Sequence, residues 1–200
     1  MRSDVNVDDS TFNDLYPLNI KKLAQRHWTP VDVAKMAANY LVQHPNDKVL
    51  DIGAGAGKFC LVGACCTEGR FYGVEQRESL VEISNEIAQK HHIDNVEFIH
   101  ANIDQISFAD YDAFYFYNSF YENMDTSCPI DHNVIPDKEL YYSYTEYLRR
   151  QLRQLPIGTR IVSYWSGWKK FPLVLNWTKR HVVECSTFGK KLVNLNLHTY

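Results

Sequence analysis

The 200-residue sequence contains no run of about 18 apolar residues, the length that a membrane-spanning helix requires. Its N-terminal segment is polar and acidic, whereas a secretory signal peptide is first basic and then apolar. The five cysteines include no Cys-x-x-Cys pair and are odd in number, which argues against a disulfide framework and against a zinc site. We therefore expect a cytoplasmic protein with reduced thiols, no metal site and no membrane partner.

The sequence also lacks an excess of positive charge. Lys and Arg together number 21 against 24 Asp and Glu, which gives a formal net charge of −3 at pH 7. Proteins that bind nucleic acids usually carry a basic field, so a nucleic-acid partner is not favoured. One segment interleaves aromatic and basic residues, and we interpret it as a solvated loop with packed indoles: Trp165, Trp168, Lys169 and Lys170.

Composition and spacing indicate one globular domain. Apolar residues make up 45% of the chain and charged residues 22%, which is ordinary for a soluble protein, and no change in composition divides the chain. We expect residues 1–28 to be an N-terminal extension, loosely attached up to about Ser10 and with a short helix at 18–27, and residues 29–200 to be a single domain. Apolar residues at helical spacing predict further helices at 28–44, 58–66, 79–92 and 138–152.

Short apolar runs between these helices predict buried strands at 48–53, 70–75, 96–102, 111–118 and 158–165. Strands that alternate with helices form a parallel sheet with right-handed crossovers and helices on both faces. The last part of the chain differs, because residues 181–189 and 190–200 flank a Gly189-Lys190 turn and predict an antiparallel hairpin. The sequence therefore indicates an α/β fold in which a mostly parallel sheet ends in a hairpin.

A glycine-rich loop follows the first predicted strand, in the segment VLDIGAGAGKF at 49–59. A P-loop that binds nucleoside triphosphates would require glycine at position 52 and a hydroxyl at position 59, where the sequence has Ile52 and Phe59. The dinucleotide fingerprint G-x-G-x-x-G would require glycine in place of Lys58. The pattern that is complete is D-x-G-x-G-x-G, formed by Asp51, Gly53, Gly55 and Gly57.

This pattern resembles motif I of the class I S-adenosylmethionine-dependent methyltransferases. The resemblance covers roughly residues 29–200 and implies a Rossmann-like, seven-stranded, mostly parallel sheet with helices on both faces and a C-terminal antiparallel β-hairpin. It also implies S-adenosyl-L-methionine as the cofactor. Glycine leaves bare backbone against which the amino-acid tail and ribose of that cofactor can lie, and Asp51 would favour its ammonium group, usually through water.

Two further strand ends resemble the same family. A carboxylate at the tip of the second strand accepts hydrogen bonds from both ribose hydroxyls, roughly 20 residues after the glycine loop, and Glu75 occupies this place. After the third strand, the side-chain carbonyl of Asn102 would accept from the adenine amine, although a turn residue explains Asn102 equally well. Together with their neighbours, the residues expected to bind the cofactor are Thr29, Asp51, Gly53, Ala54, Gly55, Gly57, Glu75, Gln76, Asn102, Ile103 and Asn118.

The segment Trp28-Thr29-Pro30 has two interpretations. It resembles an aromatic-Thr-Pro segment that precedes motif I in some methyltransferases of amino groups, whose threonine reaches the cofactor carboxylate. The alternative is that Thr29 only caps the helix that follows, with Pro30 in its first turn. The sequence alone does not separate the two.

The chemistry is expected at the end of the fourth strand, because ligands of open parallel sheets lie beyond the carboxyl ends of the strands. The tetrad Asn118-Ser119-Phe120-Tyr121 resembles the [DN]-P-P-[YFW] motif of methyltransferases that act on amino or amide nitrogen, although both prolines are missing. We expect Asn118 to accept a hydrogen bond from a nitrogen nucleophile. Tyr121 would stack on a planar substrate or favour the cationic sulfonium, and Glu122 would act as a general base.

We therefore predict a methyltransferase that uses S-adenosylmethionine. Its acceptor is not identified by the sequence, with a nitrogen of a protein side chain or of a small molecule as the candidate. Cys128, Asp131 and His132 are expected in a loop over the substrate. Two alternatives stay open: a non-catalytic cofactor-binding module of the same fold and, less favoured, an NAD(P)-dependent oxidoreductase. Nothing in the sequence indicates the oligomeric state.

Overall fold

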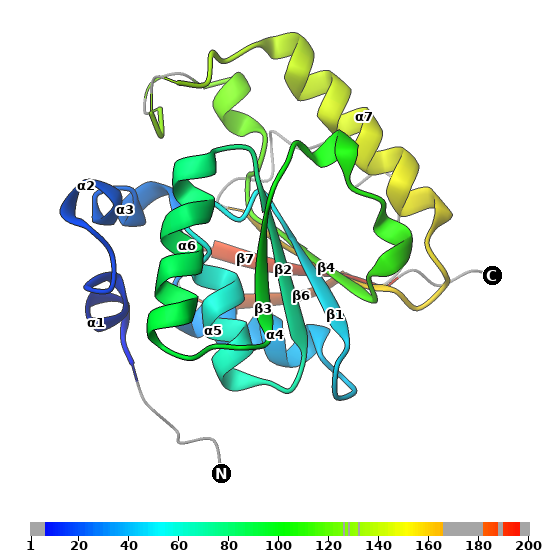
Figure 1. Ribbon diagram of the computed structural model, residues 1–200. Helices are drawn as coiled ribbons and strands as arrows, with labels where there is room; N and C mark the ends of the chain where they lie inside the picture. The colour runs from blue at the N-terminus through cyan, green and yellow to red at the C-terminus, as the bar shows by residue number, and fades with distance from the viewer. Residues whose placement is uncertain are drawn as a thin grey trace.

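A parallel sheet lies at the centre of the computed structural model, which describes residues 7–125, 127, 129–131, 133–165, 182–187 and 190–196 (Figure 1). Its five parallel strands are β1 (Lys48–Ile52), β2 (Arg70–Glu75), β3 (Val96–His100), β4 (Ala113–Phe116) and β5 (Arg160–Trp165). They lie in the order β3-β2-β1-β4-β5, so the chain moves from β1 to one edge of the sheet and then reverses to the other. The predicted α/β class with a parallel sheet is confirmed.

Two more strands follow the parallel set. β6 (Val182–Thr187) and β7 (Lys190–Asn196) pair with each other in antiparallel register, and β7 pairs with β5 in the same sense. Residue Gly189 of the predicted turn lies outside the described part of the chain.

Helices cover both faces of the sheet, as the alternation of strands and helices predicts. α4 (Val31–Leu41), α5 (Lys58–Cys66) and α6 (Glu78–Lys90) pack on one face, while α7 (Lys138–Gln154) packs on the other with the short turns η1 (Ile103–Gln105) and η2 (Phe108–Asp110) (Figure 1). β4 connects the two cores, because successive strand residues point to opposite faces. Its Ala113 and Tyr115 join the first core, whereas Phe114 and Phe116 join the second.

The N-terminal part of the chain differs from the prediction. α1 (Asp9–Asn13) begins at the end of the segment expected to be loose, and two short helices, α2 (Leu18–Lys21) and α3 (Ala24–His27), replace the single helix expected at 18–27. Residues 1–6 of the expected loose segment lie outside the described residues. α1 begins at Asp9 because the carboxylate of Asp8 accepts a hydrogen bond from the backbone N–H of Thr11 at 2.8 Å and caps the helix. The described part of the extension, from residue 7 onward, is therefore helical where its polar composition did not indicate a helix.

Within the described ranges, no helix is both long and apolar enough to cross a membrane. The same part of the chain brings together no group of three or more His, Cys, Asp or Glu side chains that could hold a metal ion.

Candidate functional site

A cavity of about 450 Å³ opens at the carboxyl ends of the parallel strands. Four loops contribute to its lining: residues 53–56 after β1, 74–77 at the end of β2, 101–103 after β3 and 117–123 after β4. Its volume lies in the range that is usual for small-molecule sites. The cavity therefore occupies the point between β1 and β4 where the strand order reverses, which is where open α/β sheets bind ligands.

The glycine loop gives this cavity a wall of bare backbone. Gly55 has a φ of 56°, and a Cβ added to it would meet no atom within 4 Å, so the residue faces open space. Gly57 differs, because a Cβ there would lie 2.6 Å from the ring of Phe98. Glycine at position 57 is thus required for packing against β3. Gly57 is not among the residues that line the cavity, although the sequence predicts that it contacts the cofactor.

Glu75 lies at the end of β2 and lines the cavity while it is only 6% exposed. Its Oε2 accepts a hydrogen bond from the backbone N–H of Gly55 at 3.0 Å, and its Oε1 accepts one from the backbone N–H of Arg77 at 3.0 Å. Burial raises the pKa of Glu75, and the guanidinium of Arg77 opposes that rise. The carboxylate and the glycine loop thus form one hydrogen-bonded unit.

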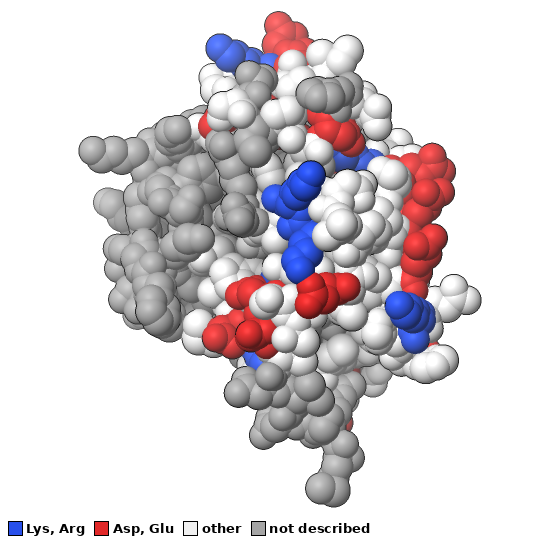
Figure 2. Space-filling model, turned by 90° about the vertical axis from the view of Figure 1, so that its left-hand side faces the viewer, with Lys and Arg blue, Asp and Glu red and all other residues white. Residues whose placement is uncertain are grey.

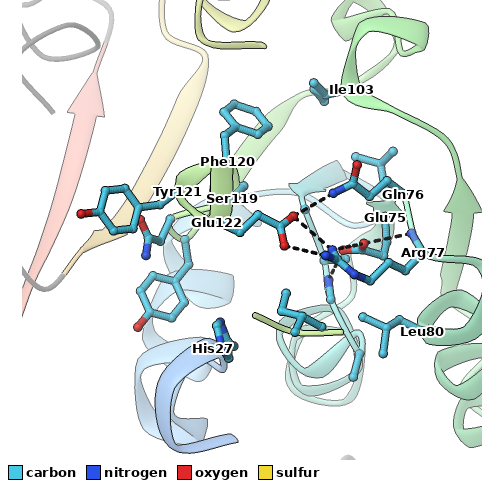
Figure 3. Close-up of a pocket in the computed structure, with 18 of the residues that line it drawn as sticks. His27, Glu75, Gln76, Arg77, Leu80, Ile103, Ser119, Phe120, Tyr121 and Glu122 are labelled. Atoms are coloured by element: carbon cyan, nitrogen blue, oxygen red, sulfur yellow. Dashed lines mark hydrogen bonds and ion pairs between the residues drawn. The ribbon is translucent and has the colours of Figure 1, made fainter. Parts of the chain in front are cut away.

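Arg77 lines the cavity but is not predicted from the sequence. Its guanidinium lies 3.5 Å from Glu75 and 2.5 Å from Glu122, to which Gln76 also donates a hydrogen bond at 2.8 Å (Figure 3). A third carboxylate, that of Asp131, accepts from Arg77 at 3.0 Å. Glu122 and Asp131 are 45 and 54 residues away from Arg77, so no local pattern reveals this cluster. Both oxygens of Glu122 are already engaged, which argues against its predicted role as general base.

Asn118 follows β4 with a φ of 55°, in the left-handed region that residues other than glycine rarely adopt. Its Oδ1 atom is buried and has no hydrogen-bond partner within the described residues. A buried amide oxygen without a donor costs free energy, so this atom is suited to accept a hydrogen bond from a bound ligand. Asn118 lines the cavity together with Tyr121 and Glu122, so the three predicted catalytic residues lie in one place.

The turn after β4 packs directly on the glycine loop. The hydroxyl of Ser119 donates to the backbone carbonyl of Ile52, and a Cβ added to Gly53 would lie 2.7 Å from the Cβ of Ser119. This close approach requires glycine at position 53 and holds Asn118 beside the loop.

Asn102 and Ile103 line the cavity at the end of β3. Asn102 is the N-cap residue of η1, and its backbone N–H donates to Oε1 of Gln105 at 2.8 Å. The turn role of Asn102 is thus observed, and its place in the cavity is compatible with the second role that the sequence suggests.

Thr29 and Asp51 are not among the residues that line the cavity, although the sequence predicts that both contact the cofactor. The hydroxyl of Thr29 is buried 2.7 Å from that of Tyr115, and it does not cap α4, whose N-cap residue is Pro30. The thiol of Cys60 donates to Oδ2 of Asp51 at 3.6 Å. Burial raises the pKa of Asp51 to about 8, so near neutral pH this carboxyl is largely protonated and offers little negative charge to an ammonium group.

The N-terminal helices form a further wall of the cavity. Leu23, His27 and Trp28 line it, although they precede the predicted domain. The hydroxyl of Tyr16 donates to the backbone carbonyl of Ala56 at 2.9 Å, which joins this segment to the glycine loop.

Lys58, the first residue of α5, fixes the same segment. Its ammonium group is buried, pairs with Asp9 and donates to Oδ1 of Asn13 at 2.9 Å. It also lies 5.5 Å and 5.7 Å from the ring centres of Phe12 and Trp28. The lysine that departs from the dinucleotide fingerprint therefore anchors the N-terminal helices.

Some predicted positions lie outside the described residues, namely Cys128, His132, Trp168, Lys169 and Lys170. Trp165 is the last residue of β5.

The family model described as a methyltransferase domain matches residues 43–181 of the chain. Among solved structures, the chain is similar to an RNA methyltransferase from Salinibacter ruber in complex with S-adenosyl-L-homocysteine, at 20% identity and a TM-score of 0.56, over 84% of this chain and 89% of that one. It is similar to TrmN from Thermus thermophilus at 18% identity and a TM-score of 0.61, over 90% of this chain but only 52% of TrmN.

The chain is also similar to a chain in a complex between the Haloferax volcanii Trm112 methyltransferase activator and a methyltransferase, at 19% identity and a TM-score of 0.52, over 80% of this chain and 61% of that one. At such identities the likeness concerns the fold alone. No curated protein matches the sequence.

Proposed function

The chain belongs to the methyltransferase domain family, and on that premise we propose that the cavity at the carboxyl ends of β1, β2 and β4 is its active site. Membership makes the chain a class I methyltransferase that depends on S-adenosyl-L-methionine. One observation supports the assignment of the cavity above all. The bare backbone of Gly55 and the carboxylate of Glu75 face the same space, and the two are hydrogen-bonded to each other.

We assign the cofactor to the side of the cavity formed by β1, β2 and β3. The main chain at Gly53, Ala54 and Gly55 would lie against its amino-acid tail and ribose. The Glu75 carboxylate would accept hydrogen bonds from the ribose hydroxyls, and the adenine would be bordered by Gln76, Asn102 and Ile103. When bound, the cofactor supplies a methyl group on a positively charged sulfonium, which is a leaving group that needs no metal. Thr29, Asp51 and Gly57 would support this wall, through the contacts of Thr29 with Tyr115, of Asp51 with Cys60 and of Gly57 with Phe98.

The β4 side of the cavity would orient the acceptor. Oδ1 of Asn118, which is buried and lacks a donor within the described residues, would accept a hydrogen bond from the acceptor and fix its direction of approach. Tyr121 would provide aromatic surface beside it. Glu122 would shape the wall through its pair with Arg77 and would not move a proton.

We propose a nitrogen of a protein side chain or of a small molecule as the acceptor. An amide oxygen such as that of Asn118 suits an N–H donor. A nucleic acid is the second candidate, because one structural neighbour is an RNA methyltransferase. Figure 2 shows Lys and Arg interspersed with Asp and Glu on one face of the described structure. The formal net charge of −3 favours the first candidate, because proteins that bind nucleic acid usually carry a basic field.

For the fold, we propose that β6 and β7 complete a seven-stranded sheet as its C-terminal hairpin. The antiparallel register of β7 with β5 supports this arrangement. We also propose that residues 29–200 form one domain. The contacts of Tyr16 and Lys58 support the addition of the described part of the extension to the same folded unit.

Isothermal titration calorimetry with S-adenosylmethionine and with S-adenosylhomocysteine tests the proposal. We expect both to bind to the wild-type protein, and Glu75→Ala to abolish binding. Glu86→Ala is the matched control, since Glu86 is exposed on α6 and outside the cavity. Absence of binding by either ligand at millimolar concentration would refute the proposal.

The acceptor is tested by incubating the protein with S-adenosylmethionine that carries a radioactive methyl group, in separate reactions with total protein, total RNA and small metabolites. Label in protein or small molecules supports a side-chain or small-molecule nitrogen. Label confined to RNA overturns that acceptor in favour of the second candidate.

A further inference from the structure

A single buried arginine pairs with three carboxylates at the mouth of the proposed cofactor site. The Arg77 side chain is 4% exposed and pairs with Glu75 at 3.5 Å, Glu122 at 2.5 Å and Asp131 at 3.0 Å. The three carboxylates belong to separate parts of the chain, namely the end of β2, the turn η3 (Tyr121–Asn123) after β4 and the segment 129–131. Figure 3 shows the guanidinium between Glu75 and Glu122.

Because Arg77 is buried, loss of its charge should cost more free energy than loss of a charge on the surface. Buried ion pairs are costly to break, because removal of one partner leaves the other charge without compensation. Here one removal would leave three carboxylates facing one another. Like charges at short distance favour the protonated form, which would affect the carboxyl that we assign to the ribose.

We infer that Arg77 is a positioning residue for cofactor binding: it holds the Glu75 carboxylate toward the cavity and joins it to the acceptor side through Glu122. This inference rests on the proposed function. The backbone N–H and the guanidinium of Arg77 both donate to Oε1 of Glu75, while the backbone N–H of Gly55 donates to Oε2. The free lone pairs of Glu75 are therefore fixed by its neighbours before any ligand binds.

Other charged groups around Glu75 determine how its titration responds. Asp51 lies behind it on β1 and interacts with it electrostatically. His100 is its register partner on β3, and the ring of His100 contacts the backbone carbonyl of Gln76 at 3.1 Å. His27 faces the cavity from α3. The guanidinium of Arg77 stays positively charged over the whole pH range of such an experiment, because arginine is not deprotonated in proteins.

The test is the pH dependence of S-adenosylhomocysteine binding, measured by calorimetry between about pH 5.5 and 8.5 for wild type, Arg77→Gln, Arg77→Lys and Arg160→Gln. In wild type, affinity is expected to fall as acid protonates Glu75. In Arg77→Gln the midpoint of that fall should move upward by at least about one pH unit, which weakens binding by at least about fivefold at the wild-type midpoint. In Arg77→Lys the midpoint should stay near that of wild type because the charge is kept, while affinity falls because a lysine lacks the planar fork.

Arg160→Gln is the matched control for loss of a largely buried ion pair. Arg160 pairs with Asp47 at 2.5 Å at the amino ends of β5 and β1, whereas the cavity lies at the carboxyl ends of the strands. The Arg160→Gln substitution should lower thermal stability and leave unchanged both the affinity for S-adenosylhomocysteine and the pH dependence of that affinity. A purely structural role of Arg77 would give the same pattern as this control.

Two results would overturn the inference: Arg77→Gln with the wild-type affinity and pH profile or, should that variant fail to fold, Arg77→Lys with the wild-type affinity. A wild-type protein that binds no S-adenosylhomocysteine would instead refute the proposed function, so the two failures are distinguishable.

Discussion

The hydroxyl of Tyr16 donates a 2.9 Å hydrogen bond to the backbone carbonyl of Ala56, 40 residues further along the chain. Tyr16 is buried, and its ring centre lies 4.4 Å from that of Trp28, which lines the cavity. Ala56 belongs to the glycine loop. One side chain thus joins the N-terminal helices both to a cavity wall and to the backbone that we propose binds the cofactor.

Tyr16→Phe removes this hydroxyl and leaves the carbonyl of Ala56 without its donor. We expect the free energy of unfolding to fall by about 1–2 kcal/mol, because a buried acceptor loses its hydrogen bond. Affinity for S-adenosylhomocysteine should fall as well, since the loop becomes less constrained. Urea denaturation and calorimetry measure the two effects, with Tyr142→Phe as the control because Tyr142 is 56% exposed. A Tyr16→Phe protein as stable as wild type would contradict the prediction.

Methyl groups placed at two positions of the glycine loop should separate binding from stability. Gly55→Ala projects into open space, so we expect a loss of about 1 kcal/mol from its positive φ but at least about a tenfold loss of affinity for S-adenosylhomocysteine. Gly57→Ala must displace the ring of Phe98, and overpacking of this kind adds about 1–3 kcal/mol. The prediction fails if Gly55→Ala binds the ligand as wild type does.

The central elements could be predicted from the sequence because their signals are local. α5 and β2 begin and end at the predicted residues, since a glycine loop opens the first and a glycine precedes the second. The cap of α4 could not be predicted in the same way. Thr29 is a good capping residue by type, but its hydroxyl is taken by Tyr115, which lies 86 residues away.

The residues of the site likewise fall into those with a local sequence signal and those that depend on distant partners. The glycine loop, Glu75 and Asn118 could be located because each follows directly from the end of a predicted strand. Arg77 and the N-terminal wall could not, since the role of each depends on partners that only the folded chain brings together, such as Asp131 for Arg77 and Ala56 for Tyr16.

Asn118→Gly should raise stability and lower activity together. Glycine adopts a φ of 55° without strain, and the substitution removes a buried oxygen that has no donor within the described residues, so we expect a gain of about 1 kcal/mol in the free energy of unfolding. Transfer of the labelled methyl group to the acceptor should fall at least about tenfold, because the acceptor loses its orienting hydrogen bond.

The matched control is Asn46→Gly, at a φ of 66° on the surface and outside the cavity. Asn46→Gly should give a smaller gain in stability, because its Oδ1 accepts a hydrogen bond from Nε of Arg70 at 3.3 Å that the substitution removes, and methyl transfer should be unchanged. Undiminished transfer by Asn118→Gly would remove Asn118 from the proposed chemistry.

Asp51 should make the stability of the fold depend on pH with a definite sign. Burial, with a smaller contribution from the charge of Glu75, raises the pKa of this carboxyl from 3.8 to about 8 in the folded state. Between these two values the folded chain holds a proton that the unfolded chain has released. The free energy of unfolding therefore falls as pH rises through this window, by at most about 1.4 kcal/mol per pH unit from this group.

Asp51→Asn tests this dependence, because asparagine resembles the protonated carboxyl in shape and does not titrate. Urea denaturation at about pH 5, 6.5 and 8 should show the stability of Asp51→Asn relative to wild type increasing with pH. Glu86→Gln, which replaces an exposed acid on α6, should give a difference from wild type that stays nearly constant over the same range. A constant difference for Asp51→Asn would show that Asp51 is ionised in the folded protein, and its negative charge would then be available to an ammonium group through the loop.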